Sequence, residues 1–170
     1  MNGSAWRLAL HQILTQAPRR LALVSVGQSL RGDDGVGQYL LERLHDLAPL
    51  PDVLLLDGAS APENLTGALR RWMPHIIVFV DAIPAPIAPT IQVVACSALA
   101  QVHGNSHSLS LGVLAHYLQQ SWQCEVYLLG ISAWQYALGA PLSAKTRAQA
   151  DLIYRFCVPY WQCGFVGDIC

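Results

Sequence analysis

Short runs of aliphatic residues constrain the fold of this 170-residue chain more than any other feature of its sequence. Each run is long enough for one strand, and a continuous apolar run is typical of a strand that is buried on both faces. Such strands occur in parallel sheets that are covered by helices. The runs are Leu21–Val26, Val53–Leu56, Ile76–Val80 and Val126–Ile131.

Amphipathic stretches separate these runs, and their apolar residues recur at helical spacing. The alternation of strand and helix predicts right-handed crossovers and a parallel core. We therefore expect one domain over residues 1–170, an α/β three-layer sandwich. Its mixed, mostly parallel sheet has about five strands, with helices on both faces. The expected helices are Ala5–Thr15, Val36–Leu47, Asn64–Trp72, Leu109–Trp122 and Ser143–Trp161.

The expected fifth strand, Thr90–Val94, follows Ile76–Val80 after a short segment rich in proline and alanine. A crossover helix does not fit into so short a connection. The sequence therefore predicts that Thr90–Val94 pairs antiparallel to its neighbour at an edge of the sheet.

Charge and cysteine content exclude several classes of protein. Ten basic residues against eleven acidic ones give a net charge of −1, so no basic surplus exists to bind nucleic acid or an anionic membrane. No apolar run reaches the ~18–20 residues that span a bilayer. The five cysteines form no CxxC pair, which is typical of a reducing compartment. We expect a cytoplasmic protein that is a monomer when free.

Acidic residues follow the first three expected strands. Asp33 and Asp34 lie in the loop after the first, Asp57 follows the second, and Asp81 follows the third. The carboxyl ends of parallel strands meet at one edge of the sheet, where α/β proteins bind ligands. Crowded carboxylates raise one another's pKa unless a cation lies among them. The pattern predicts a metal site at this edge.

Each of these aspartates also has a purely structural interpretation. Asp33 is as readily explained by capping the next helix, and Asp57 by bonding the amides of its own loop. For Asp81 a functional role is favoured, since a carboxylate after an apolar strand is costly unless it is paired or binds a cation.

Two histidines, His103 and His107, precede the expected helix Leu109–Trp122, and Gly104 and Asn105 between them indicate a loop. Two carboxylates and one imidazole suit a borderline divalent ion such as nickel, zinc or manganese. The sequence has no GxSxG motif and no cysteine beside a histidine in a motif loop. Attack by water with the assistance of a metal is therefore the simplest hydrolytic chemistry left.

Four segments together resemble the hydrogenase maturation endopeptidases, which process the large subunit of [NiFe] hydrogenases. The resemblance covers about residues 21–155. Its motifs are VGQSLRGDDGVG at Val26–Gly37, DGASAPEN at Asp57–Asn64, Val80–Ala82 and Ser106–Ser108.

The resemblance implies a compact α/β fold and removal of a short C-terminal extension from the large-subunit precursor. It implies that nickel carried by this precursor is the recognition element, for which other divalent metals can substitute in crystals. The family's catalytic, metal-binding positions fall on Asp34, Asp81 and His107.

Secondary candidates surround these three positions. Arg31 and Asp57 could orient loops or contact the precursor's tail. Gln28 stands where the family usually has asparagine, and Ala59 where it usually has glycine. His103 offers a second imidazole four residues from His107.

Two other functions remain open from the sequence. One is a non-enzymatic, metal-dependent checkpoint or chaperone in hydrogenase assembly, for which loss of a ligand position would be the sign. The other is a small-molecule-binding α/β protein. The glycine-rich loop argues against a nucleotide, because it lacks GxGxxG and the Walker lysine and carries two adjacent aspartates.

Overall fold

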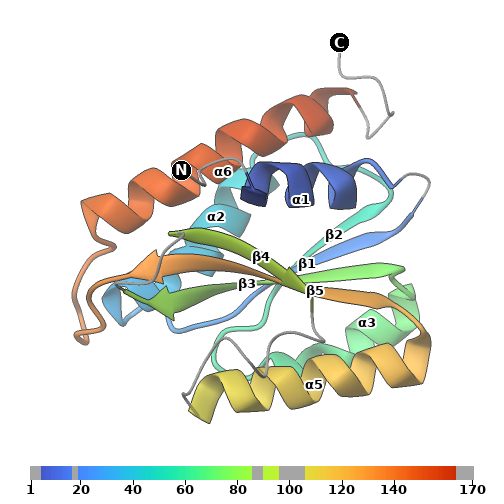
Figure 1. Ribbon diagram of the computed structural model, residues 1–170, viewed down its shortest axis with the longest axis horizontal. Coiled ribbons are helices and arrows are strands. Elements are labelled where there is room, and N and C mark those ends of the chain that lie inside the picture. The colour runs from blue at the N-terminus through green and yellow to red at the C-terminus, as the bar shows by residue number, and fades with distance from the viewer. Residues whose placement is uncertain (1–4, 17–18, 86–89, 96–105, 164–170) are drawn as a thin grey trace.

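The computed structural model describes residues 5–16, 19–85, 90–95 and 106–163, with only the backbone given for 106–110. In these residues five strands form one sheet in the order β2-β1-β3-β5-β4 (Figure 1). The expected α/β architecture with a mixed, mostly parallel sheet is confirmed. The strands are β1 (Leu21–Ser25), β2 (Val53–Asp57), β3 (Ile76–Pro84), β4 (Ile91–Ala95) and β5 (Glu125–Ala133).

Strand β4 is the antiparallel edge strand that the short connection predicts. It pairs with β5, however, and not with β3, which precedes it in the chain. Strand β5 lies between the two and continues the parallel ladder of β3.

Strand β3 is longer than its aliphatic run suggests. Its parallel ladder with β5 continues through Asp81, opposite Gly130, as far as Pro84, opposite Ala133. The expected end at Val80 was therefore wrong, because pairing with β5 extends the strand past the apolar residues. Asp81 thus lies within a strand and not in the loop after it.

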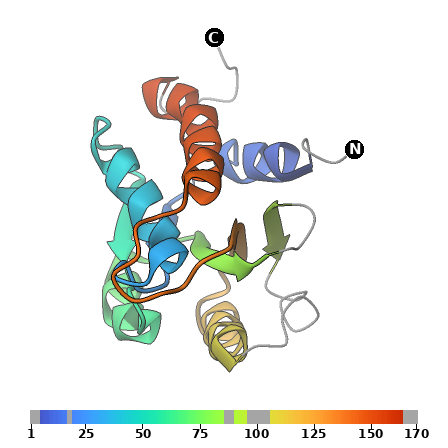
Figure 2. The same ribbon diagram turned by 90° about the vertical axis from the view of Figure 1, so that its left-hand side faces the viewer.

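Helices cover both faces of the sheet, as Figures 1 and 2 show. Helices α1 (Ala5–Leu14), α2 (Val36–His45) and α6 (Ala144–Cys163) lie on one face. Helices α3 (Thr66–Trp72) and α5 (Ser106–Trp122) lie on the other. Two short 3₁₀ turns, η1 (Gly32–Gly35) and η2 (Pro62–Leu65), precede α2 and α3. None of the helices within the described ranges is long and apolar enough to cross a membrane.

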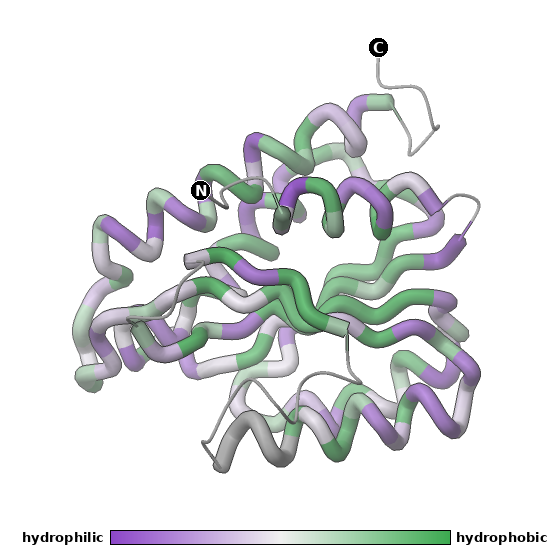
Figure 3. The backbone as a smooth tube through the Cα atoms, viewed as in Figure 1, coloured by the Kyte–Doolittle hydropathy of each residue, from purple (hydrophilic) through white to green (hydrophobic). Residues whose placement is uncertain are grey.

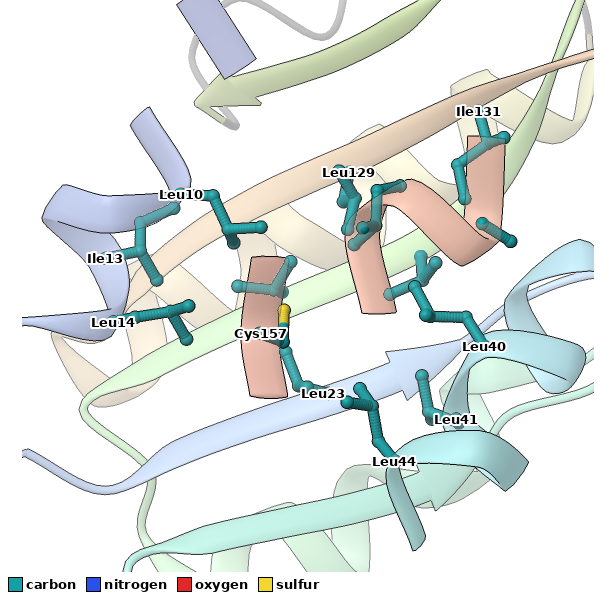
Figure 4. Packing of buried hydrophobic residues seen from close by; sticks show 14 of the residues in the cluster. Leu10, Ile13, Leu14, Leu23, Leu40, Leu41, Leu44, Leu129, Ile131 and Cys157 are labelled. Atoms are coloured by element: carbon teal, nitrogen blue, oxygen red, sulfur yellow. The ribbon is translucent and has the colours of Figure 1, made fainter. Parts of the chain in front are cut away.

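The alternation of side chains along the strands creates two separate cores. On one face, leucines of α1 and α2 and Cys157 of α6 pack against Leu23, Leu129 and Ile131 (Figure 4). On the other face, Phe79 and Ile77 of β3 pack with Leu118 of α5. Apolar residues accordingly concentrate in the strands, while polar residues recur along the helices (Figure 3).

Close packing at Gly37 fixes the start of α2 against the carboxyl edge of the sheet. A Cβ atom at this position would lie 2.4 Å from the Val80 carbonyl oxygen and 3.2 Å from that of Val26. Glycine is therefore required for α2 to begin where β1 and β3 leave the core. This contact places the η1 turn beside the end of the apolar part of β3.

The Gly37→Ala variant tests this packing. We expect it to lower the free energy of unfolding by about 3 kcal/mol, because the new methyl group meets backbone that cannot rotate away. Urea denaturation measures the change. The matched control is Gly112→Ala in α5, where a Cβ meets nothing within 4 Å. Alanine there is expected to stabilise the protein by up to ~1 kcal/mol. Equal effects at the two positions would contradict the packing argument.

Candidate active site

Backbone hydrogen bonds bring the ends of β1, β2 and β3 together. The Val26 N–H donates to the Val80 carbonyl oxygen at 2.9 Å, and the Gly58 N–H donates to that of Ser25 at 2.9 Å. The segments that carry Asp34, Asp57 and Asp81 therefore meet at the carboxyl edge of the sheet, as in other parallel α/β proteins.

Asp34 lies in the η1 turn and is held by the glycine-rich loop that precedes it. Its Oδ2 accepts a hydrogen bond from the Gln28 N–H at 2.7 Å. Gly27 has a φ of +113°, and a Cβ there would lie 2.0 Å from the Asp34 carbonyl oxygen. Only glycine allows the loop to fold so closely over Asp34. The loop therefore sets the orientation of this half-buried carboxylate.

Asp81 is half-buried in the ladder between β3 and β5. Its pKa is raised to about 7, chiefly by burial; a hydrogen bond from the Ala82 N–H lowers the pKa, and the negative charge of Asp34 makes a smaller contribution that raises it. The influence of Asp34 identifies the two aspartates as electrostatic neighbours. A group with this pKa exchanges its proton near neutral pH, which suits acid–base chemistry and cation binding.

The imidazole expected beside these carboxylates is not described. His107 belongs to the first turn of α5, which begins at Ser106 and not at Leu109, so the expected loop placement of His107 was wrong. Figure 1 shows this end of α5 on the same side as the arrowheads of β3 and β5. The His107 side chain and all of His103 lie outside the described residues. Among the described side chains, no three His, Cys, Asp or Glu groups are placed to hold a metal.

Asp33 anchors the segment 134–143, which lies between β5 and α6. Its carboxylate accepts hydrogen bonds from the N–H of Trp134 at 2.9 Å and of Gln135 at 3.3 Å. It also accepts from the N–H and Oγ of Ser143, at 2.6 and 2.8 Å. Burial raises the pKa of Asp33, but the bonds from Trp134 and Ser143 outweigh burial and leave the pKa below its usual value. The structural interpretation of Asp33 is favoured, although it holds this segment and does not cap α2.

Asp57 also makes local hydrogen bonds. Its Oδ1 accepts from Ser25 Oγ at 2.7 Å and from the Ala59 N–H at 3.0 Å. Ala59 has a φ of +44°, a conformation that favours glycine, so these bonds hold a strained turn. Among the other secondary candidates, Gln28 contacts Asp34 through its backbone N–H, and Arg31 is exposed next to η1.

Tyr136 belongs to the same site, although no motif of the sequence indicated it. Its hydroxyl is buried and has no hydrogen-bond partner among the residues that the structure describes. Burial, followed by the charges of Asp34, Asp81 and Asp33, raises its pKa to about 12. The one available signal was its position after a buried strand, at the edge where ligands bind.

Comparison with known proteins finds relatives of this chain in sequence and in fold. The hydrogenase 3 maturation protease of Escherichia coli K12 is 30% identical over 135 residues, which are 78% of this chain and 85% of that protein. No family model matches the chain.

Two solved structures share the fold. The [NiFe] hydrogenase maturation protease HycI from Thermococcus kodakarensis is 25% identical, with a TM-score of 0.76 over 91% of this chain and 99% of that one. A crystal structure of hydrogenase 3 maturation protease is 28% identical, with a TM-score of 0.69 over 81% of this chain and 88% of that one.

The Asp81→Asn variant tests the burial of Asp81 in the metal-free protein. The folded-state pKa, about 7, is above the ordinary value of 3.8, so wild-type stability falls as pH rises from about 4 through 7. Asparagine resembles the neutral acid and removes this slope. At pH 8 we expect the variant to be more stable than wild type by as much as ~4 kcal/mol, at ~1.4 kcal/mol per pKa unit. Urea denaturation with a chelator between pH 4 and 8 measures the slope, and an unchanged slope would refute the assignment.

The Asp33→Asn variant is expected to have the opposite effect. The pKa of Asp33 is lowered in the folded state, so its ionised form stabilises the protein above pH 4 and this contribution is lost as pH falls. The new amide group would face N–H donors, and we expect a loss of about 3 kcal/mol at pH 7. The same denaturation series measures it. Wild-type stability at pH 7 would show that Asp33 does not anchor segment 134–143.

Proposed function

Because this chain belongs to the hydrogenase maturation protease family, we propose that it removes a short C-terminal extension from the precursor of a [NiFe] hydrogenase large subunit. The chain is a protease, as its relatives are. The finer assignment of the substrate is supported by the activity for which those relatives are named and by the composition of the acidic site.

The meeting of the segments that carry Asp34 and Asp81 at one edge of the sheet is the observation that carries this proposal. Two carboxylates at one edge of the sheet, one with a pKa raised to about 7, form a site that a divalent cation would stabilise. In our proposal this cation is nickel that the precursor already carries, and Asp34, Asp81 and His107 are its ligands on the protease. Oxygen and imidazole donors suit nickel.

Binding of the substrate's nickel would hold the scissile peptide bond against this site. Positioning of this kind converts a bimolecular reaction into a unimolecular one. Asp81 holds a proton near neutral pH in the free protein, and binding of the substrate's nickel would displace that proton. We place the reaction in the cytoplasm and assign the free protease as a monomer. The free thiols of Cys124, Cys157 and Cys163 agree with a reducing compartment.

Substitution of the proposed ligands tests the function. We expect Asp34→Asn, Asp81→Asn and His107→Ala each to lower processing of nickel-loaded precursor by about 100-fold or more, since even outer-shell changes at metal sites cost ~10–100-fold. The loss of mass of the precursor, read by mass spectrometry, measures the reaction.

Asp46→Asn is the matched control, because Asp46 is an exposed acid at the far end of α2 and should leave processing unchanged. Circular dichroism confirms that each variant folds. Complete processing by all three ligand variants would reject the site, and no processing by the wild type would reject the function.

A further inference from the structure

Tyr136 is the described residue at the acidic site that the proposed function does not yet use. It lies in segment 134–143, which follows β5 and leads into α6. This segment reaches the same edge of the sheet as Asp34 and Asp81, because β5 is parallel to β3. It is therefore a fourth chain segment at the site.

The segment is fixed at both of its ends. Asp33 accepts hydrogen bonds from Trp134 and Gln135 at one end and from Ser143 at the other. The Asp33 N–H also donates to the Gln135 carbonyl oxygen at 2.9 Å. Gly32 packs against that carbonyl so closely that a Cβ would lie 2.8 Å from its oxygen. The η1 turn therefore orients Asp34 and, through Asp33, the backbone on both sides of Tyr136.

The Tyr136 hydroxyl is buried and has no partner among the described residues, although the charges of three carboxylates, Asp34, Asp81 and Asp33, act on it. Hydroxyl groups buried in proteins are nearly always hydrogen-bonded, so an orphaned one at a reaction site indicates an acceptor that arrives with the substrate. Neither Asp34 nor Asp81 is a hydrogen-bond partner of this hydroxyl. The phenol is thus left as a donor on a rigid support.

We propose that the Tyr136 hydroxyl donates a hydrogen bond to a backbone carbonyl oxygen of the precursor peptide held at Asp34 and Asp81. This inference rests on the proposed function, since a peptide substrate supplies the acceptor. Carbonyl oxygens are the acceptors that every peptide presents, whatever its side chains. Tyr136 is therefore a substrate-binding residue that acts independently of the metal ligands.

The Tyr136→Phe variant tests whether the hydroxyl binds the substrate or stabilises the fold. It removes a hydroxyl that has no partner among the residues that the structure describes, so the Tm should stay equal or rise. Loss of one neutral hydrogen bond to the substrate should weaken precursor binding and raise KM by about three- to tenfold, with kcat nearly unchanged. The probe is the nickel-loaded precursor, studied by processing kinetics and by surface plasmon resonance.

Tyr117→Phe is the control, because Tyr117 is 54% exposed on α5 and should change neither constant. An unchanged KM and Kd for Tyr136→Phe would overturn the proposal. A lowered Tm would do the same by showing a structural hydrogen bond, and so would a fall in kcat alone, which places the hydroxyl in the chemistry.

Failure of the proposed function gives a different result. If the wild type binds the precursor without cleaving it, and Tyr136→Phe binds three- to tenfold more weakly, then the assigned cleavage is wrong and the Tyr136 contact is upheld. If the wild type neither binds nor cleaves this precursor, both are rejected.

Discussion

Burial of a carboxyl group inside the parallel ladder of β3 and β5 is the constraint on which the site depends. Asp81 pairs with Gly130 across the ladder. It follows Val80, whose carbonyl oxygen makes the close contact with Gly37. Ionisation there is opposed by burial and by the charge of Asp34. An apolar residue would fit the strand at lower cost. Residues that lower the stability of the fold without a compensating local interaction are typical of functional sites.

The two adjacent aspartates in η1, Asp33 and Asp34, have different roles. Asp33 is fully buried and satisfied by N–H and hydroxyl donors, so its charge stabilises the fold. Asp34, one residue later, adds a negative charge that raises the pKa of Asp81, and so contributes repulsion in place of stabilisation. One four-residue segment thereby positions a charged group at the site and secures segment 134–143 that carries Tyr136.

Periodicity and strand-end chemistry were sufficient to predict the fold and the meeting of the acidic segments. The runs of aliphatic residues gave the parallel strands, and the short proline-rich connection gave the antiparallel edge strand β4. The end of β3 was missed because pairing with β5, a long-range contact, extends it past Asp81. The hydrogen-bond partners of Asp33 could not be predicted from the sequence either, since Trp134 and Ser143 lie about a hundred residues away in the chain. Tyr136 has no local pattern at all, and only the assembled edge identifies it.

The two aspartates also supply a physical reason for selecting a metal-loaded substrate. In the proposed reaction a precursor without nickel would bring its peptide to carboxylates that still repel each other, and Asp81 would stay partly protonated near neutral pH. A precursor with nickel would displace that proton and relieve the repulsion in the same step. The difference in binding free energy between the two precursors would then come from the acidic pair, while Tyr136 contacts peptide backbone common to both. Selection of the nickel-loaded precursor would thus depend on Asp34 and Asp81, whereas Tyr136 would add affinity for the peptide of either precursor.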